Sequence, residues 1–185
     1  MLTGQKEQAG KKNSGKVIVG YDLGRVVSQI SYCLPDGSMA ETVSSVAGTE
    51  QYNIPTVLCK RKGVNQWFYG KEALKYAADG EGIPVENLLL LAERGEDVVV
   101  EEESYDPVAL LTLFVKRSLG LLNMQVSLNR MDALMFTVED LSPRMVDVLS
   151  KIATGLQLKI QNIYFQSHVE SFYHYVLYQP KELWK

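Results

Sequence analysis

Two strand–helix units in the C-terminal third decide the fold of this chain. Residues 133–176 read ALMFTVEDLSPRMVDVLSKIATGLQLKIQNIYFQSHVESFYHYV. Ala133 to Val138 is a short apolar strand, Ile160 to Phe165 is a second one, and a segment with helical apolar spacing follows each. Because strands that alternate with helices pair in parallel through right-handed crossovers, this stretch predicts an α/β fold.

Both helices of this stretch have recognisable start signals. Ser142 and Pro143 begin the first helix, and Gly155 stands where a left-handed C-terminal cap is expected. Ser167 to Glu170 matches a capping box at the start of the second helix. The apolar stripes of the two helices consist of Met145, Val148, Leu149 and Ile152, and of Val169, Phe172, Tyr173 and Val176. Each stripe predicts one buried helix face.

The N-terminal part predicts an antiparallel meander of three strands. Residues 16–34 are rich in β-forming side chains, are interrupted at Gly24, and lead into a turn signal at Pro35 to Gly37. Ser38 to Val46 then alternates between apolar and polar residues and supplies the third strand.

The middle of the chain predicts two short strands and two helices. Ile54 to Lys60 and Gln66 to Tyr69 are the strands, and Lys71 to Ala78 is a brief helix. Residues 81–105 have a mixed pattern, which we interpret as a solvated insertion that includes the acidic run Glu101 to Glu103. Asp106 is a good N-cap for a buried helix that continues to Leu122.

This order of elements resembles that of the ribonuclease-H-like fold. The resemblance implies a single domain over residues 16–185, with a mixed five-stranded sheet made of an antiparallel meander and parallel strand–helix units, flanked by helices. Residues 1–15 are polar and rich in Lys, Gln and Gly, so we expect a disordered leader there. We expect an insertion near residues 80–105.

Composition narrows the class of protein. A chain of 185 residues, 46% of them hydrophobic, is long enough to bury one core. Its 19 basic and 22 acidic residues form no basic cluster, which argues against a nucleic-acid partner. Cys33 and Cys59 have no metal-ligand spacing, which fits a reducing cytoplasm. The longest apolar runs fall short of the ~20 residues of a membrane-spanning helix, so we expect no membrane anchor.

One hairpin has a pattern associated with phosphate binding. Gly20 to Gly24 reads Gly-Tyr-Asp-Leu-Gly, and Arg25 to Ser28 follows. Gly24 lets backbone N–H groups approach an anion closely, and Asp22 at the strand end is suited to hold a magnesium ion through waters. The stretch resembles the first phosphate hairpin of the superfamily of actin-like ATPases, which includes actin and the heat-shock chaperones.

Further segments extend this resemblance over most of the chain. Ile54 to Val57 and Phe68 to Leu74 resemble chaperone segments, and residues 132–175 resemble the last two strand–helix units. The resemblance implies ATP with Mg²⁺ as cofactor, with Asp22 positioning the metal, Gly24 and Arg25 facing the phosphates, and Gln166 as the catalytic residue that orients the attacking water.

The hairpin also departs from the superfamily pattern. Arg25, Val26 and Val27 stand where relatives have Thr or Ser, so hydroxyl donors are missing until Ser28. Arg25 either pairs with a phosphate or is a surface residue of a degenerate loop.

The resemblance implies a missing half. In this superfamily ATP lies between two such subdomains, so we expect a second actin-like subdomain in the same longer chain. Transfer of a phosphoryl group needs charges that converge from several sides. This segment alone is therefore expected to hydrolyse ATP poorly or not at all.

Two other functions follow from other groups of residues. A scaffold or interaction module that binds a protein partner without enzymatic activity fits the C-terminal aromatic residues, about half of which we expect in the core. They are Tyr164, Phe165, Phe172, Tyr173, Tyr175, Tyr178 and Trp184. A ribonuclease-H-like nuclease would need converging carboxylates, for which Asp22, Glu139 or Asp140, and Glu170 are the candidates. His168 and His174 lie six residues apart and are interpreted as structural.

Overall fold

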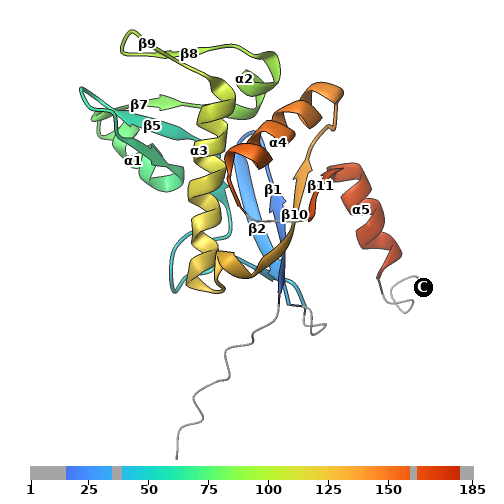
Figure 1. Ribbon diagram of the computed structural model, residues 1–185. Helices are drawn as coiled ribbons and strands as arrows, with labels where there is room; N and C mark the ends of the chain where they lie inside the picture. Colours follow the sequence, from blue (N-terminus) through green and yellow to red (C-terminus); the bar gives the residue numbers. More distant parts are fainter. Residues whose placement is uncertain (1–15, 35–38, 159–161, 180–185) are drawn as a thin grey trace, which may run out of the picture.

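The computed structural model describes residues 16–34, 39–158 and 162–179 (Figure 1). The predicted leader, the Pro35 to Gly37 turn, the first two residues of the strand predicted from Ile160, and Trp184 lie outside these ranges. The protein has a mixed α/β fold, in which helices pack against a sheet that contains both parallel and antiparallel strands.

The central sheet carries the elements that were predicted for the two ends of the chain. In the described residues its strands are β1 (Val17–Asp22), β2 (Val27–Cys33), β3 (Glu41–Thr42), β4 (Ile54–Pro55), β10 (Met131–Val138) and β11 (Asn162–Ser167). Their order is β11-β10-β1-β2-β3, and β4 pairs with β2 outside this path. β1 and β2 are antiparallel, as are β2 and β3, whereas β1, β10 and β11 are parallel. The predicted mixed sheet is confirmed, but in the described residues it has six strands and not the predicted five, because β4 also pairs with β2. Its third strand, β3, has only two residues.

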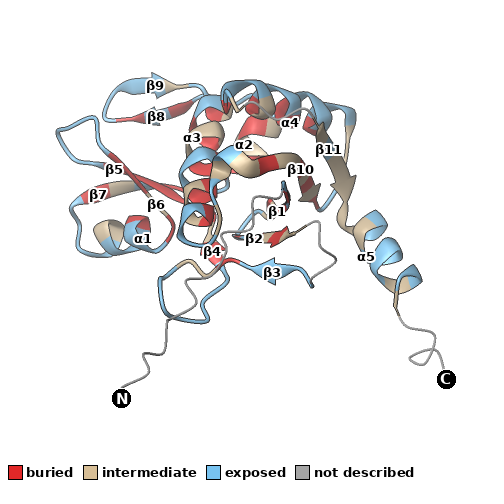
Figure 2. Ribbon diagram, turned by 60° about the horizontal axis from the view of Figure 1, so that its bottom comes forward, coloured by how far each residue is buried: buried red, intermediate tan, exposed pale blue. Residues whose placement is uncertain are grey.

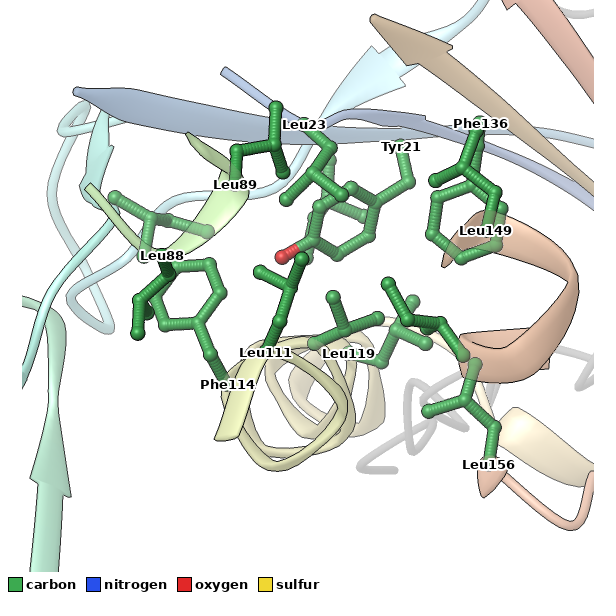
Figure 3. Close-up of a cluster of buried hydrophobic side chains, with 14 of the residues drawn as sticks. Tyr21, Leu23, Leu88, Leu89, Leu111, Phe114, Leu119, Phe136, Leu149 and Leu156 are labelled. Atoms are coloured by element: carbon green, nitrogen blue, oxygen red, sulfur yellow. The ribbon is translucent and has the colours of Figure 1, made fainter. Parts of the chain in front are cut away.

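Two helices cover one face of this sheet. α3 (Pro107–Leu119) begins as predicted, because the Asp106 side chain accepts a hydrogen bond from the Val108 backbone, and it continues as a 3₁₀ segment, η1 (Gly120–Met124). α4 (Pro143–Gly155) is capped by Ser142, whose hydroxyl accepts from the Met145 backbone over 3.1 Å. Figure 3 shows Tyr21 and Phe136 pointing from the sheet toward these helices.

A buried tyrosine fixes α3 on the sheet. The Tyr21 hydroxyl lies 2.6 Å from Ser118 Oγ, and Ser118 Oγ donates to the Phe114 carbonyl over 2.8 Å. Because the serine proton is used in that bond, Tyr21 is the donor in the first one. Burial raises the pKa of Tyr21 well above its ordinary value, so the hydroxyl keeps its proton.

Gly155 has a different role from the one predicted. It is the last residue of α4 and has no left-handed conformation, which occurs instead at Gln157 with φ 52°. A Cβ atom added at Gly155 would lie 3.0 Å from Thr112 Cγ2. The predicted left-handed cap is therefore wrong, and the glycine lets α4 approach α3 closely.

A second, smaller sheet packs on the other side of α3 (Figure 1). Its strands are β5 (Leu58–Arg61), β6 (Trp67–Tyr69) and β7 (Gly82–Val85), in the order β6-β5-β7, and α1 (Gly70–Ala78) packs against them. The solvated interpretation of residues 81–105 is wrong. β7 pairs with β5, and α2 (Leu88–Arg94) buries Leu88, Leu89 and Ala92 in the main core.

Within the part of the chain that the structure describes, one helical stretch meets the length and composition criteria for a membrane span. Pro107–Met124, which joins α3 and η1, has 18 residues and a mean hydropathy of 1.2. Leu111, Phe114 and Val115 of this stretch are fully buried in the core of the protein. A core helix meets the same criteria, so the finding does not assign a membrane location.

An ion pair fastens the acidic hairpin β8 (Val98–Val100) and β9 (Glu103–Tyr105) to β5. The Lys60 ammonium, although almost fully buried, lies 2.6 Å from Glu101 Oε2, and the Gly63 backbone donates to Glu101 Oε1 over 2.9 Å. The hydrogen bond from Lys60, followed by that from Gly63, lowers the pKa of Glu101. The bond to Glu101 raises the pKa of Lys60. Glu101 is thus a tertiary contact, which the interpretation as a solvated run missed.

We expect Glu101→Gln to lower the melting temperature by several degrees at neutral pH. The folded-state pKa of Glu101 lies below its unfolded value, so the stabilisation is complete above the unfolded value and is lost as pH falls through the folded one. Thermal melts from neutral pH down to below about pH 4 should therefore show the difference from wild type shrinking in acid. Glu102→Gln, at the exposed neighbouring position, is the matched control. Equal effects of the two substitutions would contradict the assignment.

The last helix differs most from its prediction. α5 (His168–Leu177) has the predicted capping box, because Ser167 Oγ accepts from the Glu170 backbone and the Glu170 carboxylate accepts from the Ser167 backbone. Its predicted apolar stripe is not buried, and α5 extends beyond β11 away from the other helices (Figures 1 and 2). Of the aromatic residues in this region, Phe165 packs against the core. The expectation that about half would do so is too high.

Candidate functional site

The carboxyl ends of three parallel strands bring polar side chains to one edge of the central sheet. Asp22 on β1 is paired in register with Thr137 on β10, and Thr137 is paired with Gln166 on β11. On the other side of β1, Asp22 is paired with Gln29 of β2. Four neighbouring strands therefore carry a polar row of one carboxylate, one hydroxyl and two amides.

This polar row lies on the sheet face opposite α3 and α4. Tyr21 and Phe136, which directly precede Asp22 and Thr137, point toward the helices. Successive side chains of a strand point to opposite faces, so Asp22 and Thr137 point away from the core. Asp22 and Thr137 are accordingly only partly buried, and Gln29 is exposed. A ligand can reach the row from solvent.

His168, at the first position of α5, adds an imidazole to the row. Its Nε2 lies 2.6 Å from Asp22 Oδ1, and Thr137 Oγ1 donates to the same oxygen over 3.4 Å. The pair is about half open to solvent, with 42% of the His168 side chain and 46% of the Asp22 side chain exposed. An exposed imidazole–carboxylate pair can exchange protons or help to bind a cation. Interpreting His168 as structural missed this contact, which joins residues 146 positions apart.

The turn between β1 and β2 is held close to β10. The Leu23 backbone donates to the Thr137 carbonyl over 2.9 Å. A Cβ atom added at Gly24 would lie 2.1 Å from the Val27 carbonyl oxygen, which is far closer than real Cβ atoms approach. Gly24 has no positive φ, so this position requires glycine because of the close approach of the chain to itself.

Arg25 has a carboxylate partner at this edge. Its Nε lies 3.1 Å from Glu139 Oε2, and both side chains are substantially exposed. The pair links the β1–β2 turn to the segment that joins β10 and α4. An incoming phosphate would have to replace Glu139 as the partner of the guanidinium.

The first hydroxyl after the turn is not directed to this edge. Ser28 Oγ lies 2.9 Å from Thr56 Oγ1, and both residues are buried. The departure from the superfamily pattern, in which Thr or Ser follows Asp-x-Gly, therefore extends through Ser28. Any anion at this turn would rely on backbone N–H groups and on Arg25.

The described residues do not bring several metal-ligating side chains together. Within residues 16–34, 39–158 and 162–179, no group of three or more His, Cys, Asp or Glu is placed to hold a metal ion. Glu139 is paired with Arg25, and Glu170 is used in the capping box of Ser167. A magnesium ion at Asp22 would thus depend on water or on the phosphates of a nucleotide for most of its ligands.

An apolar hollow of about 330 Å³ lies beside the same turn. Its lining includes Val26, Val27, Pro55 and Leu74, together with Arg25. Val26 is 74% exposed, so part of this lining is open to solvent. The sequence pattern does not predict this hollow, because segments far apart in the chain form it.

These observations define a protein of the α/β class, with a mixed sheet and a polar row at the carboxyl edge of its parallel strands. Residues 39–185 match the family described as "Family of unknown function (DUF5716) C-terminal", and the chain belongs to this family. Thr137, Gln166 and His168 lie within the matched segment, whereas Asp22, Gly24 and Arg25 precede it. No curated protein matches the chain.

Proposed function

We propose that this chain is a nucleotide-binding half of an actin-like protein and takes ATP with Mg²⁺ at the carboxyl edge of its central sheet. The observation that supports this most is the register that aligns Asp22, Thr137 and Gln166 on adjacent parallel strands. In open α/β sheets, ligands commonly bind at the carboxyl ends of the strands. The tight turn at Gly24 lies directly beside this row.

The strand arrangement also supports the proposal. A central strand with an antiparallel meander on one side and two parallel strands on the other is the arrangement expected of a ribonuclease-H-like motif. The proposed assignment to this motif, and to the superfamily of actin-like ATPases, rests on this topology together with the Asp22–Gly24 turn.

Each site residue has a proposed role. Asp22 holds Mg²⁺ through waters, backbone N–H groups near Gly24 face the phosphates, and Arg25 leaves Glu139 to pair with them. Gln166 orients the attacking water. His168 competes with the metal for Asp22 Oδ1, because its imidazole already contacts that atom.

Hydrolysis in this proposal requires a second actin-like subdomain in the same longer chain, which would place charges on the other side of the phosphates. The 185-residue chain alone is expected to bind nucleotide weakly and to have little hydrolytic activity. A cytoplasmic location, where ATP is available, fits this function.

A titration of the 185-residue chain with Mg²⁺–ATP, followed by amide NMR shifts, tests nucleotide binding. We expect saturable shifts at millimolar nucleotide that centre on residues 22–26 and that EDTA reverses. Asp22→Ala should weaken Mg²⁺–ATP binding about 10-fold or more. Loss of a side chain that contacts a metal indirectly, through the metal's direct ligands, typically lowers metal affinity on this scale. His168→Ala should strengthen binding, because it leaves Asp22 Oδ1 to the metal.

Asp132→Ala is the matched control. Asp132 lies at the opposite end of the same sheet, on β10, and pairs with Lys16 over 2.8 Å. It should leave nucleotide affinity unchanged. If neither the wild type nor His168→Ala binds at millimolar Mg²⁺–ATP, or if Asp22→Ala binds as well as the wild type, the proposal is wrong.

A non-enzymatic scaffold or interaction module with an actin-like fold is the second candidate. The exposed Val26, the apolar hollow beside it, and the engagement of Arg25 by Glu139 favour this function, because all three suit a protein surface better than a phosphate. Loss of a protein partner on Val26→Asp, without any dependence on nucleotide, would support it. The nuclease alternative gains no such support, since Glu139 and Glu170 are engaged elsewhere, and neither Glu139 nor Asp140 joins Asp22 in a group of three or more metal-ligating side chains within the described residues.

A further inference from the structure

Most of the apolar stripe of α5 is exposed, although its spacing is that of a buried helix face, and its last residue, Val176, is partly buried. Val169, Phe172, Tyr173 and Val176 follow the i, i+3, i+4, i+7 pattern. Val169, Phe172 and Tyr173 are nevertheless 75%, 67% and 61% exposed, and α5 has no buried residue. Figure 2 shows α5 at the outside of the molecule, beyond β11. A contiguous exposed apolar face of this kind marks an interaction site.

The order of residues within the stripe is self-complementary. Residues 169–176 read VESFYHYV, so the apolar positions are the same from either end: a valine, two intervening residues, two aromatic residues, two more residues and a valine. If a twofold axis passes between Phe172 and Tyr173, the two copies of the helix are antiparallel, and Phe172 of one copy faces Tyr173 of the other. Val169 of one copy would then face Val176 of the other. This reciprocity is what an interface between identical chains requires.

We propose that a second copy of this chain covers the stripe, and that α5 forms an antiparallel, twofold-symmetric helix pair. Antiparallel packing also opposes the two helix dipoles, which is favourable. The inference does not rest on the proposed nucleotide function.

The exposed area indicates how strong the association is. Full burial of an aromatic side chain removes about 150–250 Å² from solvent, and of a valine or leucine roughly 60–120 Å². With the exposures given above, and with Leu177 at 54%, two stripes would bury at most on the order of 500–1,000 Å² in total. This falls below the standard size of about 1,600 Å² and within the range of small, transient interfaces. The dimer is therefore a weak one, and we expect a dissociation constant in the micromolar range.

Sedimentation velocity of the 185-residue chain over a range from low micromolar to several hundred micromolar tests the dimer. We expect the weight-average sedimentation coefficient to rise with concentration. Phe172→Glu should raise the dissociation constant at least about 10-fold, since central aromatic residues dominate such contacts. The matched control is Val99→Glu on β8, which makes the same change in charge at an apolar position that is 69% exposed.

Cysteine pairing tests the orientation independently of any effect on folding. In the antiparallel arrangement an equimolar mixture of Val169→Cys and Val176→Cys chains should form a cross-linked dimer under mild oxidation. Each variant alone should not, because equivalent positions would lie about 10 Å apart, beyond the reach of a disulfide. Wild type, which retains Cys33 and Cys59, gives the background.

Three results would overturn the proposal. The first is a wild type that stays monomeric at the highest concentration, which would mean that a different polypeptide covers the stripe. Phe172→Glu could dimerise as well as Val99→Glu, which would put the contact elsewhere. The single cysteine variants could cross-link as efficiently as the mixture, which would exclude the antiparallel pair.

Discussion

Replacing Phe114 with alanine lowers the free energy of unfolding by about 3–5 kcal/mol, the cost of emptying a fully buried aromatic position. Phe114 is fully buried on α3. Its ring lies 6.4 Å from that of Tyr69, edge to face, and its carbonyl accepts the hydrogen bond from Ser118. Figure 3 shows its side chain near Leu88 and Leu111. The residue thus joins the core of the central sheet to the smaller sheet.

Thermal and urea denaturation measure this effect. For a chain of this length the loss corresponds to a fall in melting temperature on the order of 10 °C. Phe114→Leu is the comparison, because leucine fills most of the same site and leaves a smaller cavity, so it should cost clearly less than alanine. If the alanine and leucine variants melt together, the side chain does not connect the two sheets as described.

Replacing Gly24 with alanine has the second large effect. The new Cβ would meet the Val27 carbonyl oxygen at 2.1 Å, and a backbone atom cannot move away as a flexible side chain can. The β1–β2 turn must open, which weakens the bond from the Leu23 backbone to Thr137. We expect a loss of about 1–3 kcal/mol, typical of forcing extra atoms into a packed site.

Gly120→Ala is the matched control for this substitution. Gly120 has a helical φ of −57°, and a Cβ atom there would meet nothing within 4 Å. It should leave stability unchanged or raise it by about 0.4–1 kcal/mol. Hydrogen exchange at the Leu23 amide should accelerate only in the Gly24 variant. A Gly24→Ala protein as stable as wild type would show that the turn does not need the close approach.

Local signals predicted the helix starts correctly. The caps at Asp106, Ser142 and Ser167 were identified because each depends on residues within three positions of itself. The alternation of strands and helices from Ala133 onward likewise predicted parallel pairing, which β10 and β11 confirm.

Contacts between distant segments could not be predicted in this way. The Asp22–His168 pair and the Lys60–Glu101 pair join residues 146 and 41 positions apart, and nothing in either local pattern specifies the other partner. The left-handed cap predicted at Gly155 was wrong for the same reason, because the glycine lies close to Thr112 on another helix. For the candidate site, the sequence selected Asp22, Gly24, Arg25 and Gln166, and their proposed roles remain predictions.

The stripe of α5 shows a further limit of periodicity. The pattern specifies that one face of the helix is apolar, but it does not specify which surface covers that face. The spacing predicted that this face is buried in the core, whereas Phe172 and Tyr173 are exposed. Burial depends on where the rest of the sheet ends, and β11 is its last strand.

The position of β1 between β2 and β10 sets an order of events during synthesis on the ribosome. β2 follows β1 directly in the sequence. On its other side β1 pairs with β10, where Thr137, the partner of Asp22, lies 115 residues further along the chain. At about 5–20 residues per second, the nascent hairpin waits roughly 6–23 seconds for β10. Throughout that interval one edge of β1 offers unpaired backbone groups to any other strand. Newly made chains are therefore most exposed to mispairing before residue 138 leaves the exit tunnel, and chaperone demand should peak in that interval.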